Sequence, residues 1–151
     1  MADSRRQDII EKVIAAMQTI NGAGSFVTSI GTNVADWRLN WQEEDLPALS
    51  VCDTDESFEP LNDEISMQST LSVQIRGFLK ATDSTLRAIE GRKVIADILT
   101  AVKANQKWTN LAQYTQLKQA GFVLADDAFS IAAVAVNIEI IYFAERFSPY
   151  G

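Results

Sequence analysis

The feature of this chain that most constrains its fold is a long alternating segment, ISMQSTLSVQIRGFLKA, which begins at Ile65. Apolar and polar side chains alternate for about a dozen residues, whereas the mean strand has about 5–6. Such a strand reaches roughly 40 Å, because each residue adds about 3.3 Å. It should therefore extend beyond the core of a small domain, together with the acidic segment DTDESFEPLNDE before it. An arm of this kind, from Asp53 to about Ala81, favours assembly over catalysis.

Two segments have the periodicity of amphipathic helices. The first runs from about Arg5 to Ile20 and follows Ser4, which forms an S-x-x-Q capping sequence with Gln7. The second begins at Asp83-Ser84-Thr85 and should end near Asn105. Both helices carry an apolar stripe and should pack on a sheet.

Further strands are expected where apolar residues alternate or cluster between turn residues. The expected strands are 25–32, 36–42, one that begins after Pro47, 122–125 and 128–143, the last two separated by Asp126-Asp127. Residues 106–120 should form a loop with a short strand or helical turn. The element order favours an α+β fold, with a largely antiparallel or mixed sheet, two main α-helices on one face and a long hairpin-like arm. With 151 residues and no visible linker, a single domain over 1–151 is expected.

The residue content argues against an enzyme. The chain has no histidine, which removes the usual general base near neutral pH and the commonest metal ligand. It has neither of the glycine-rich motifs that cradle phosphates, and no acidic-x-lysine triplet of the kind found in metal-dependent nucleases. We therefore expect no catalytic residue and no cofactor.

Charge and hydropathy indicate a soluble intracellular protein. The net charge is -7 and no basic run occurs, so tight binding to a nucleic-acid backbone is not expected, although an acidic surface would let DNA pass without sticking. The amino terminus lacks the apolar core of a signal peptide, and the longest apolar run is too short for a membrane helix. The single cysteine, Cys52, lies in the apolar run LPALSVC and should be a buried structural thiol.

The acidic segment matches a calcium-binding loop only in part. With Asp53 at position 1, Glu64 falls at position 12, where a bidentate glutamate belongs. Position 6 is Phe58 instead of glycine, Pro60 follows at position 8, and the flanks read as strands rather than helices. An acidic, solvated connection is the better interpretation, and no metal site is expected.

Acidic residues are nevertheless concentrated here, since residues 43–64 contain nine of them and no basic residue. Like charges repel, which favours an exposed segment. Two interpretations stay open, a solvated loop and an acidic face that meets a basic partner or lines a passage for DNA. The acidic interface candidates are Glu43, Glu44, Asp45, Asp53, Asp55, Glu56, Glu59, Asp63 and Glu64.

Two tryptophans and several basic residues are further interface candidates. Trp37 and Trp41, on one face of the strand 36–42, are more typical of a core than of a contact, although tryptophan is enriched at interface hot spots. Basic residues near the end of the long strand could pair with the acidic segment of a neighbouring copy or simply face solvent. These are Arg76, Lys80 and Arg87.

The order of the segments is distinctive. A short amino-terminal helix precedes strands, a Leu-Pro-Ala strand start at Leu46, the acidic segment, the long strand, a helix containing VIADILTAVKAN and a closing strand that ends EIIYFAERFSPYG. In this order and spacing the chain resembles, over nearly its full length, the tail terminator (tail completion) proteins of long-tailed bacteriophages.

The resemblance implies a structural role without catalysis. Such proteins form a ring, typically a hexamer, on the head-proximal end of a completed tail tube. The ring stops addition of the major tail tube protein and offers its other face to the head completion or connector protein, while DNA only passes through the lumen. The location implied is the virion tail, after assembly in the bacterial cytoplasm, and no membrane is involved.

Within that role, we expect the arm from Asp53 to Glu64 and the following strand to form the subunit–subunit or tube-facing contact. The alternative functions are a neck or head-completion adaptor, or an unrelated non-catalytic α+β module that binds proteins.

Overall fold

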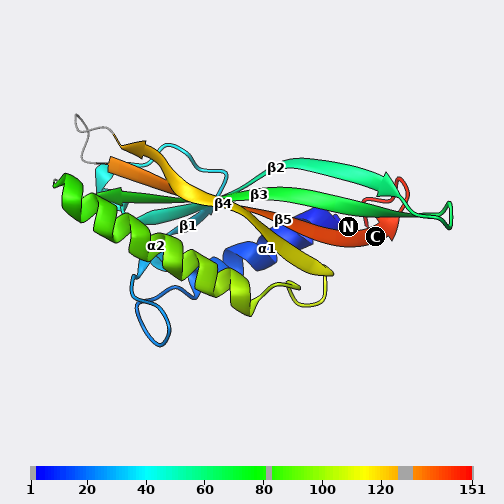
Figure 1. Cartoon of the computed structure of the whole chain (residues 1–151), viewed down its shortest axis with the longest axis horizontal. Coiled ribbons are helices and arrows are strands. Elements are labelled where there is room, and N and C mark those ends of the chain that lie inside the picture. The colour runs from blue at the N-terminus through cyan, green and yellow to red at the C-terminus, as the bar shows by residue number, and fades with distance from the viewer. Residues whose placement is uncertain (1–2, 81–82, 126–130, 151) are drawn as a thin grey trace.

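The fold is a five-stranded sheet that carries both helices on one face (Figure 1). This computed structural model describes residues 3–80, 83–125 and 131–150. The strand order is β1-β2-β3-β5-β4, with β1 parallel to β2 and the other neighbours antiparallel. The elements are α1 (Arg5–Gln18), β1 (Val34–Asp36), β2 (Ala48–Pro60), β3 (Ser66–Lys80), α2 (Ser84–Ala104), β4 (Tyr114–Ala125) and β5 (Ile131–Glu145), with short 3-10 helices at Ile30–Thr32 and Glu43–Asp45. The expected α+β class with a mixed sheet is confirmed.

Both helices begin at the caps that the sequence predicts. The Ser4 hydroxyl accepts a hydrogen bond from the backbone N–H of Gln7 at 3.2 Å. The Asp83 carboxylate accepts from the backbone N–H groups of Thr85 and Leu86. Each cap satisfies backbone donors that the first helical turn leaves without a partner.

The hydrophobic core lies between the two helices and one face of the central strands. In β3, Leu71 and Ile75 are buried and pair with Ile140 and Val136 of β5, which are also buried. The helices supply the other side of the core, from Ile9, Val13 and Met17 of α1 and Val94 and Ile98 of α2. The expected period of two in β3 therefore decides which face of the sheet the helices cover.

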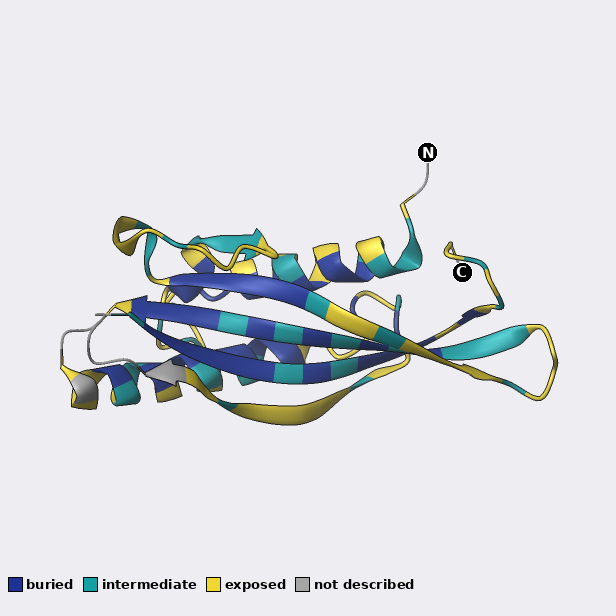
Figure 2. Cartoon of the chain, turned by 90° about the horizontal axis from the view of Figure 1, so that it is seen from above, coloured by how far each residue is buried: buried dark blue, intermediate teal, exposed yellow. Residues whose placement is uncertain are grey.

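The two long strands β2 and β3 continue past this core as a hairpin arm. Figure 1 shows the arm projecting beyond the ends of both helices. Along β2, residues 48–52 are buried, whereas residues 54–60 are exposed apart from the half-buried Glu56 (Figure 2). The predicted hairpin-like arm is thus present.

One correction concerns the acidic segment, which the sequence favours as a solvated connection. Residues 53–60 belong to β2, and the turn that joins β2 to β3 is short. The strand forms because β3 offers a partner along the whole segment, from Asp53 opposite Val73 to Pro60 opposite Met67. Cross-strand pairing with a strand that is already held by β5 outweighs the mutual repulsion of the carboxylates.

The expected strand 25–32 is also wrong. This segment is irregular up to the 3-10 helix at 30–32, because its amides bind a side chain of α2. The carboxylate of Asp97, which is 1% exposed, accepts from the backbone N–H groups of Val27 and Thr28 and from the Thr28 hydroxyl, at 2.7–3.0 Å. Donors engaged by a buried carboxylate cannot join a strand ladder.

The expected strand 36–42 is replaced by the end of β1 and a loop. Trp37 has a φ of 60°, which ends the extended backbone after Asp36. The Trp37 indole N–H then donates to the Asp53 carboxylate on β2, and the Trp41 indole N–H donates to the nearby Arg38 carbonyl. The alternating tryptophans therefore reflect side-chain contacts of a loop and not one face of a strand.

The last two strands differ from expectation mainly in length. β4 covers Tyr114–Ala125, so it includes the second half of the segment 106–120, which was expected to be a loop with a short strand or helical turn. Its side chains are exposed almost throughout, which explains why hydrophobic alternation gave little signal there. The final strand is confirmed from Ile131 onward, while Asp126-Asp127 and Ala128 lie outside the described residues.

We predict that Gly31→Ala destabilises the protein strongly. A Cβ at position 31 would lie 2.6 Å from the Ile20 carbonyl oxygen and closer still to that of Met17, both of which are backbone atoms. The end of α1 would have to move to avoid this clash, which should lower the free energy of unfolding by roughly 3 kcal/mol. Urea denaturation measures the loss. The matched control is Gly121→Ala, where a Cβ meets nothing within 4 Å, and equal stability of the two variants would contradict this view of the packing.

Candidate assembly surface

The tip of the arm is a defined turn over residues 61–65. The Asp63 carboxylate accepts from the backbone N–H groups of Ile65 and Ser66 at 3.0 and 2.7 Å, and these hydrogen bonds hold the pKa of Asp63 below its usual value. The Leu61 N–H donates to the Ser66 carbonyl at 3.0 Å, and Glu64 has a φ of 60°. These hydrogen bonds therefore define the backbone conformation of the turn.

The segment after β5 binds this turn. The backbone N–H of Arg146 donates to the Ile65 carbonyl at 2.8 Å, and the guanidinium donates to the carbonyls of Leu61 and Ser66 at 3.3 and 3.4 Å. The next residue, Phe147, has a φ of 60° and a side chain that is 98% exposed. Two segments distant in sequence thus form one surface.

An apolar recess lies where these segments meet. A cavity of about 390 Å³ is lined by Phe58, Pro60, Met67, Arg146 and Phe147. An adjoining cavity of about 400 Å³ shares three of these residues and reaches the start of α1 and Tyr142. Ile65, at the tip, is 63% exposed. We call the exposed Phe58, Ile65 and Phe147 with this recess the arm surface.

Charged residues fasten the base of the arm to α1. Arg6 contacts Asp53 at 2.5 Å through Nε and Glu56 at 3.5 Å through Nη1. The Trp37 indole N–H donates to the other oxygen of Asp53 at 2.8 Å, and the Tyr142 hydroxyl donates to Glu56. Two of the predicted acidic interface residues are therefore held inside the subunit and are mostly shielded from solvent.

Burial of Tyr142 shifts its ionisation. The side chain is 5% exposed, and its pKa is raised above the ordinary value first by burial and then by the hydrogen bond to the Glu56 carboxylate. Both effects disfavour a phenolate, because it would be buried beside an anion. Tyr142 is thus held neutral, as the donor that Glu56 needs.

The remaining predicted residues fall into two groups. At the opposite end of β3, Lys80 lies 3.4 Å from Glu43 and Arg38 lies 3.1 Å from Asp45, so these acidic residues have partners within the subunit. Trp41 packs near Phe78, with the Arg38 guanidinium 4.2 Å from the centre of its ring. Among the predicted acidic residues, Glu43 is itself exposed, as are Glu44, Asp55, Glu59, Asp63 and Glu64.

Two of the predicted basic residues also have contacts within the subunit. Arg76 donates to the side chain of Gln74, its neighbour on the uncovered face of β3. Arg87 is buried within the subunit. Of the predicted tryptophans, Trp37 is about half exposed. The structure thus brings Asp53, Glu56 and Trp37 together at the base of the arm, and places Glu43, Asp45, Lys80 and Trp41 elsewhere.

Sequence reasoning missed Arg6, Tyr142 and Phe147. A signal existed for Arg6, since a basic residue in the first turn of a helix opposes the helix dipole and suggests an acidic partner. Tyr142 lay in a strand that was predicted, but its contact with Glu56 joins residues far apart in the chain. No local pattern marks Phe147 as exposed.

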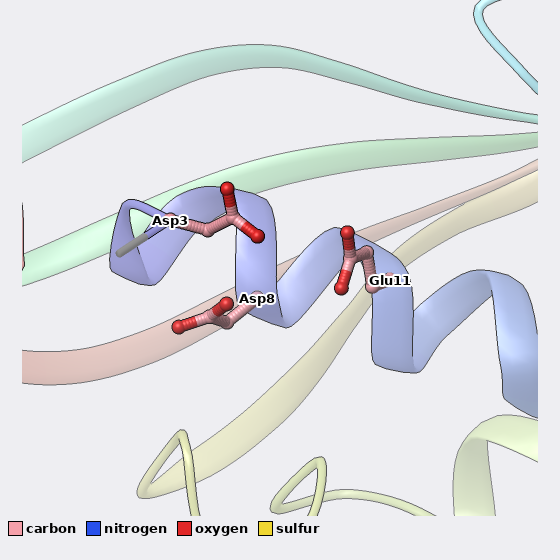
Figure 3. Close-up of side chains that lie close together, drawn as sticks. All are labelled: Asp3, Asp8 and Glu11. Atoms are coloured by element: carbon pink, nitrogen blue, oxygen red, sulfur yellow. The ribbon is translucent and has the colours of Figure 1, made fainter. Parts of the chain in front are cut away.

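A third acidic group lies at the start of α1, where Figure 3 shows Asp3, Asp8 and Glu11. Their carboxylate oxygens lie within 4.8 Å of one another. Asp8 lies in the first turn, where the helix dipole stabilises an acidic side chain. Glu11 lies a turn further along and accepts a hydrogen bond from the Gln7 side chain at 3.2 Å. Exposed acidic groups of this kind are common without a bound ion.

Comparison with known proteins adds little. No family model matches the chain, and no curated protein matches it. Among solved structures, a chain from the virion of a native gene transfer agent particle is similar at 12% identity, with a TM-score of 0.46, over 87% of this chain and 94% of that chain. A likeness at this level carries no argument about function. In the described part of the chain, no helix is long and apolar enough to cross a membrane.

We predict that alkaline pH weakens the fold through Tyr142. Its folded pKa lies above the unfolded value of about 10, so the neutral tyrosine contributes stability below pH 10, and this contribution is lost as pH rises beyond it. Urea denaturation from pH 8 to 11.5 should show a steeper loss for the wild type than for Tyr142→Phe. Tyr114→Phe, at an exposed tyrosine, is the control. Equal slopes for all three proteins would refute the assignment.

Proposed function

We propose that this chain is a structural virion protein that forms a ring on the head-proximal end of a phage tail tube. The ring ends tube polymerisation and provides a docking surface for the head connector. The proposal rests on the resemblance in element order and on one structural observation, the arm that runs past the core and ends in a defined surface. Its mechanism would be surface complementarity, without catalysis or a cofactor.

The arm surface has the composition of a protein contact. Ile65 and Phe147 are 63% and 98% exposed, although both are large and apolar. Ile65 lies on the turn at the tip, and Phe147 lies on the segment that hydrogen bonds to this turn. Apolar groups gathered around a recess lose contact with water when a partner covers them. The partner proposed for the tip of this surface, Ile65 and Phe147, is the end of the tail tube.

The charges of the arm suit a ring through which DNA passes. Glu59, Asp63 and Glu64 are exposed near the tip, and the whole chain has a net charge of -7. Carboxylates facing a lumen repel the phosphate backbone, which keeps DNA from binding there. A closed ring also has no free end of its own, which explains how such a protein would limit growth.

We predict that the exposed apolar residues of the arm surface are needed for capping. The double variant Ile65→Ser, Phe147→Ser should no longer cap tubes, while its stability stays within about 0.5 kcal/mol of wild type because both side chains are exposed. Tube length after mixing protein with polymerising tube subunits, seen by electron microscopy, measures capping. Light scattering with and without tubes measures ring formation.

The matched control is Val27→Ser, an apolar side chain that is 68% exposed and lies away from the arm. It should cap tubes normally. Normal capping by the arm variant would remove the arm surface from the proposal. Failure of the wild-type protein itself to limit tube length would overturn the terminator function, and binding to connectors instead would indicate a neck adaptor.

A further inference from the structure

The sheet has two long backbone edges that no strand of the described chain covers. On one side β4 is the last strand of the sheet, and its described side chains are exposed except at Thr115 and Gly121 (Figure 2). On the other side β1 pairs with only three residues of β2, Leu49–Val51, so residues 54–60 of β2 have an open edge. Open edges carry free N–H and C=O groups that another strand can pair with.

The two edges are complementary in charge. Residues 54–60 of β2 contain the exposed Asp55 and Glu59, besides Glu56, which Arg6 and Tyr142 compensate within the subunit, and no basic residue. β4 contains Lys118 and no acidic residue. Two β2 edges would therefore repel each other, and an acidic edge next to a basic one is favoured. Charge thus selects pairing between unlike edges, which are both present in every copy of the chain.

The apolar side chains of the two edges lie on the same face of the sheet. Phe58 is opposite Ser69, and Leu117 and Phe122 are opposite Ile138 and Val134, all in the rows that face the helices. These three side chains are 44–58% exposed in the single subunit. Placing one edge beside the other would bring them together and bury apolar surface that the subunit leaves in water.

We propose that β4 of one subunit pairs with residues 54–60 of β2 in the next subunit, so that the sheet continues from copy to copy. This inference rests on the ring proposed above and names the contact that closes it. The pairing is head-to-tail, since each copy uses a different edge toward each neighbour. Head-to-tail contacts generate a ring when the rotation closes.

The topology decides the strand direction of this contact. β2, β3, β5 and β4 are successively antiparallel, so β4 runs opposite to β2 within one subunit. Copies related by rotation about an axis along the strands keep their strand directions. β4 is therefore antiparallel to the neighbouring β2, which is the arrangement of every other long pair in the sheet.

The register requires the strands to be tilted in the ring. Traced through β3, residues 54–60 of β2 lie beside the part of β5 that follows Ile138, near the arm. β4, in contrast, pairs with residues 132–141 of β5. The open edge of β2 is level with residues 139–144 of β5, so the centres of the two edges are offset by about five residues over the four long strands of a subunit. A stagger of about one residue per strand is that of closed barrels, whose strands tilt by about 36°.

Cysteine cross-linking tests the contact. Ser57 of β2, like Gln116 and Gln119 of β4, lies on the face away from the helices, and all three are exposed. Ser57→Cys combined with Gln116→Cys or Gln119→Cys should give disulfide-linked oligomers up to the full ring when rings on tail tubes are oxidised. The native Cys52 does not interfere, because it is buried and burial raises the pKa of its thiol.

The control uses the alternation of side chains in a strand. Ser57→Cys combined with Leu117→Cys places the second thiol on the helix face, so it should form at least tenfold less cross-linked product, because a disulfide needs Cβ atoms about 3.8 Å apart. Each single cysteine variant should give no ladder. In a second measurement, Lys118→Glu should weaken ring formation, and adding Asp55→Lys should restore it.

Contrary outcomes separate this inference from the proposed function. Cross-linked dimers of the single Gln116→Cys variant would show that β4 pairs with itself and would overturn the head-to-tail contact. Variants that cap tubes but form no ladder would overturn the edge pairing and leave the terminator function standing. A ladder from rings that do not limit tube length would support the pairing and overturn the terminator function.

Discussion

β3 and β5 form the central pair of the sheet, and every other element packs on them or on a strand that they hold. The two strands stay in register from Ser66 opposite Glu145 to Lys80 opposite Ile131, without a bulge. Their buried row supplies the surface on which both helices pack, and their far ends support the arm. Because the helices cover only part of this length, the remaining backbone must find partners in β2 and in the segment that carries Arg146. The protruding arm follows from two strands that are longer than the core.

Charge has opposite effects in two parts of the molecule. At the base of the arm, Arg6 and the Tyr142 hydroxyl compensate two carboxylates, so Asp53 and Glu56 can lie in a strand beside α1. Toward the tip, Glu59, Asp63 and Glu64 face solvent, and exposed ion pairs or single charges there contribute little to stability. The acidic residues nearest the core thus stabilise the arm, while those at its end are available to a partner or to a lumen.

Sequence reasoning succeeded where periodicity was long and failed where contacts were distant. β3, both helices and most of β5 follow from apolar spacing and capping residues. The strand expected at 25–32 failed because a carboxylate about seventy residues away, Asp97, takes its amides. The strand expected at 36–42 failed for the same reason. The positive φ of Trp37 ends the extended backbone, and its indole N–H donates to Asp53 on β2. For the candidate surface, the arm itself was predictable, but Phe147 reaches it only through the hydrogen bonds of Arg146.

The α+β class, the two capped helices and an overlong strand with an acidic neighbour can be read from local spacing and composition. The three-dimensional fold was needed to show that the acidic neighbour is a strand, which carboxylates are compensated within the subunit and which backbone edges stay open. Those outcomes depend on which segments meet in space, and a strand is stable only when a partner satisfies its backbone. The free edges of β2 and β4 are visible only once the strand order is known.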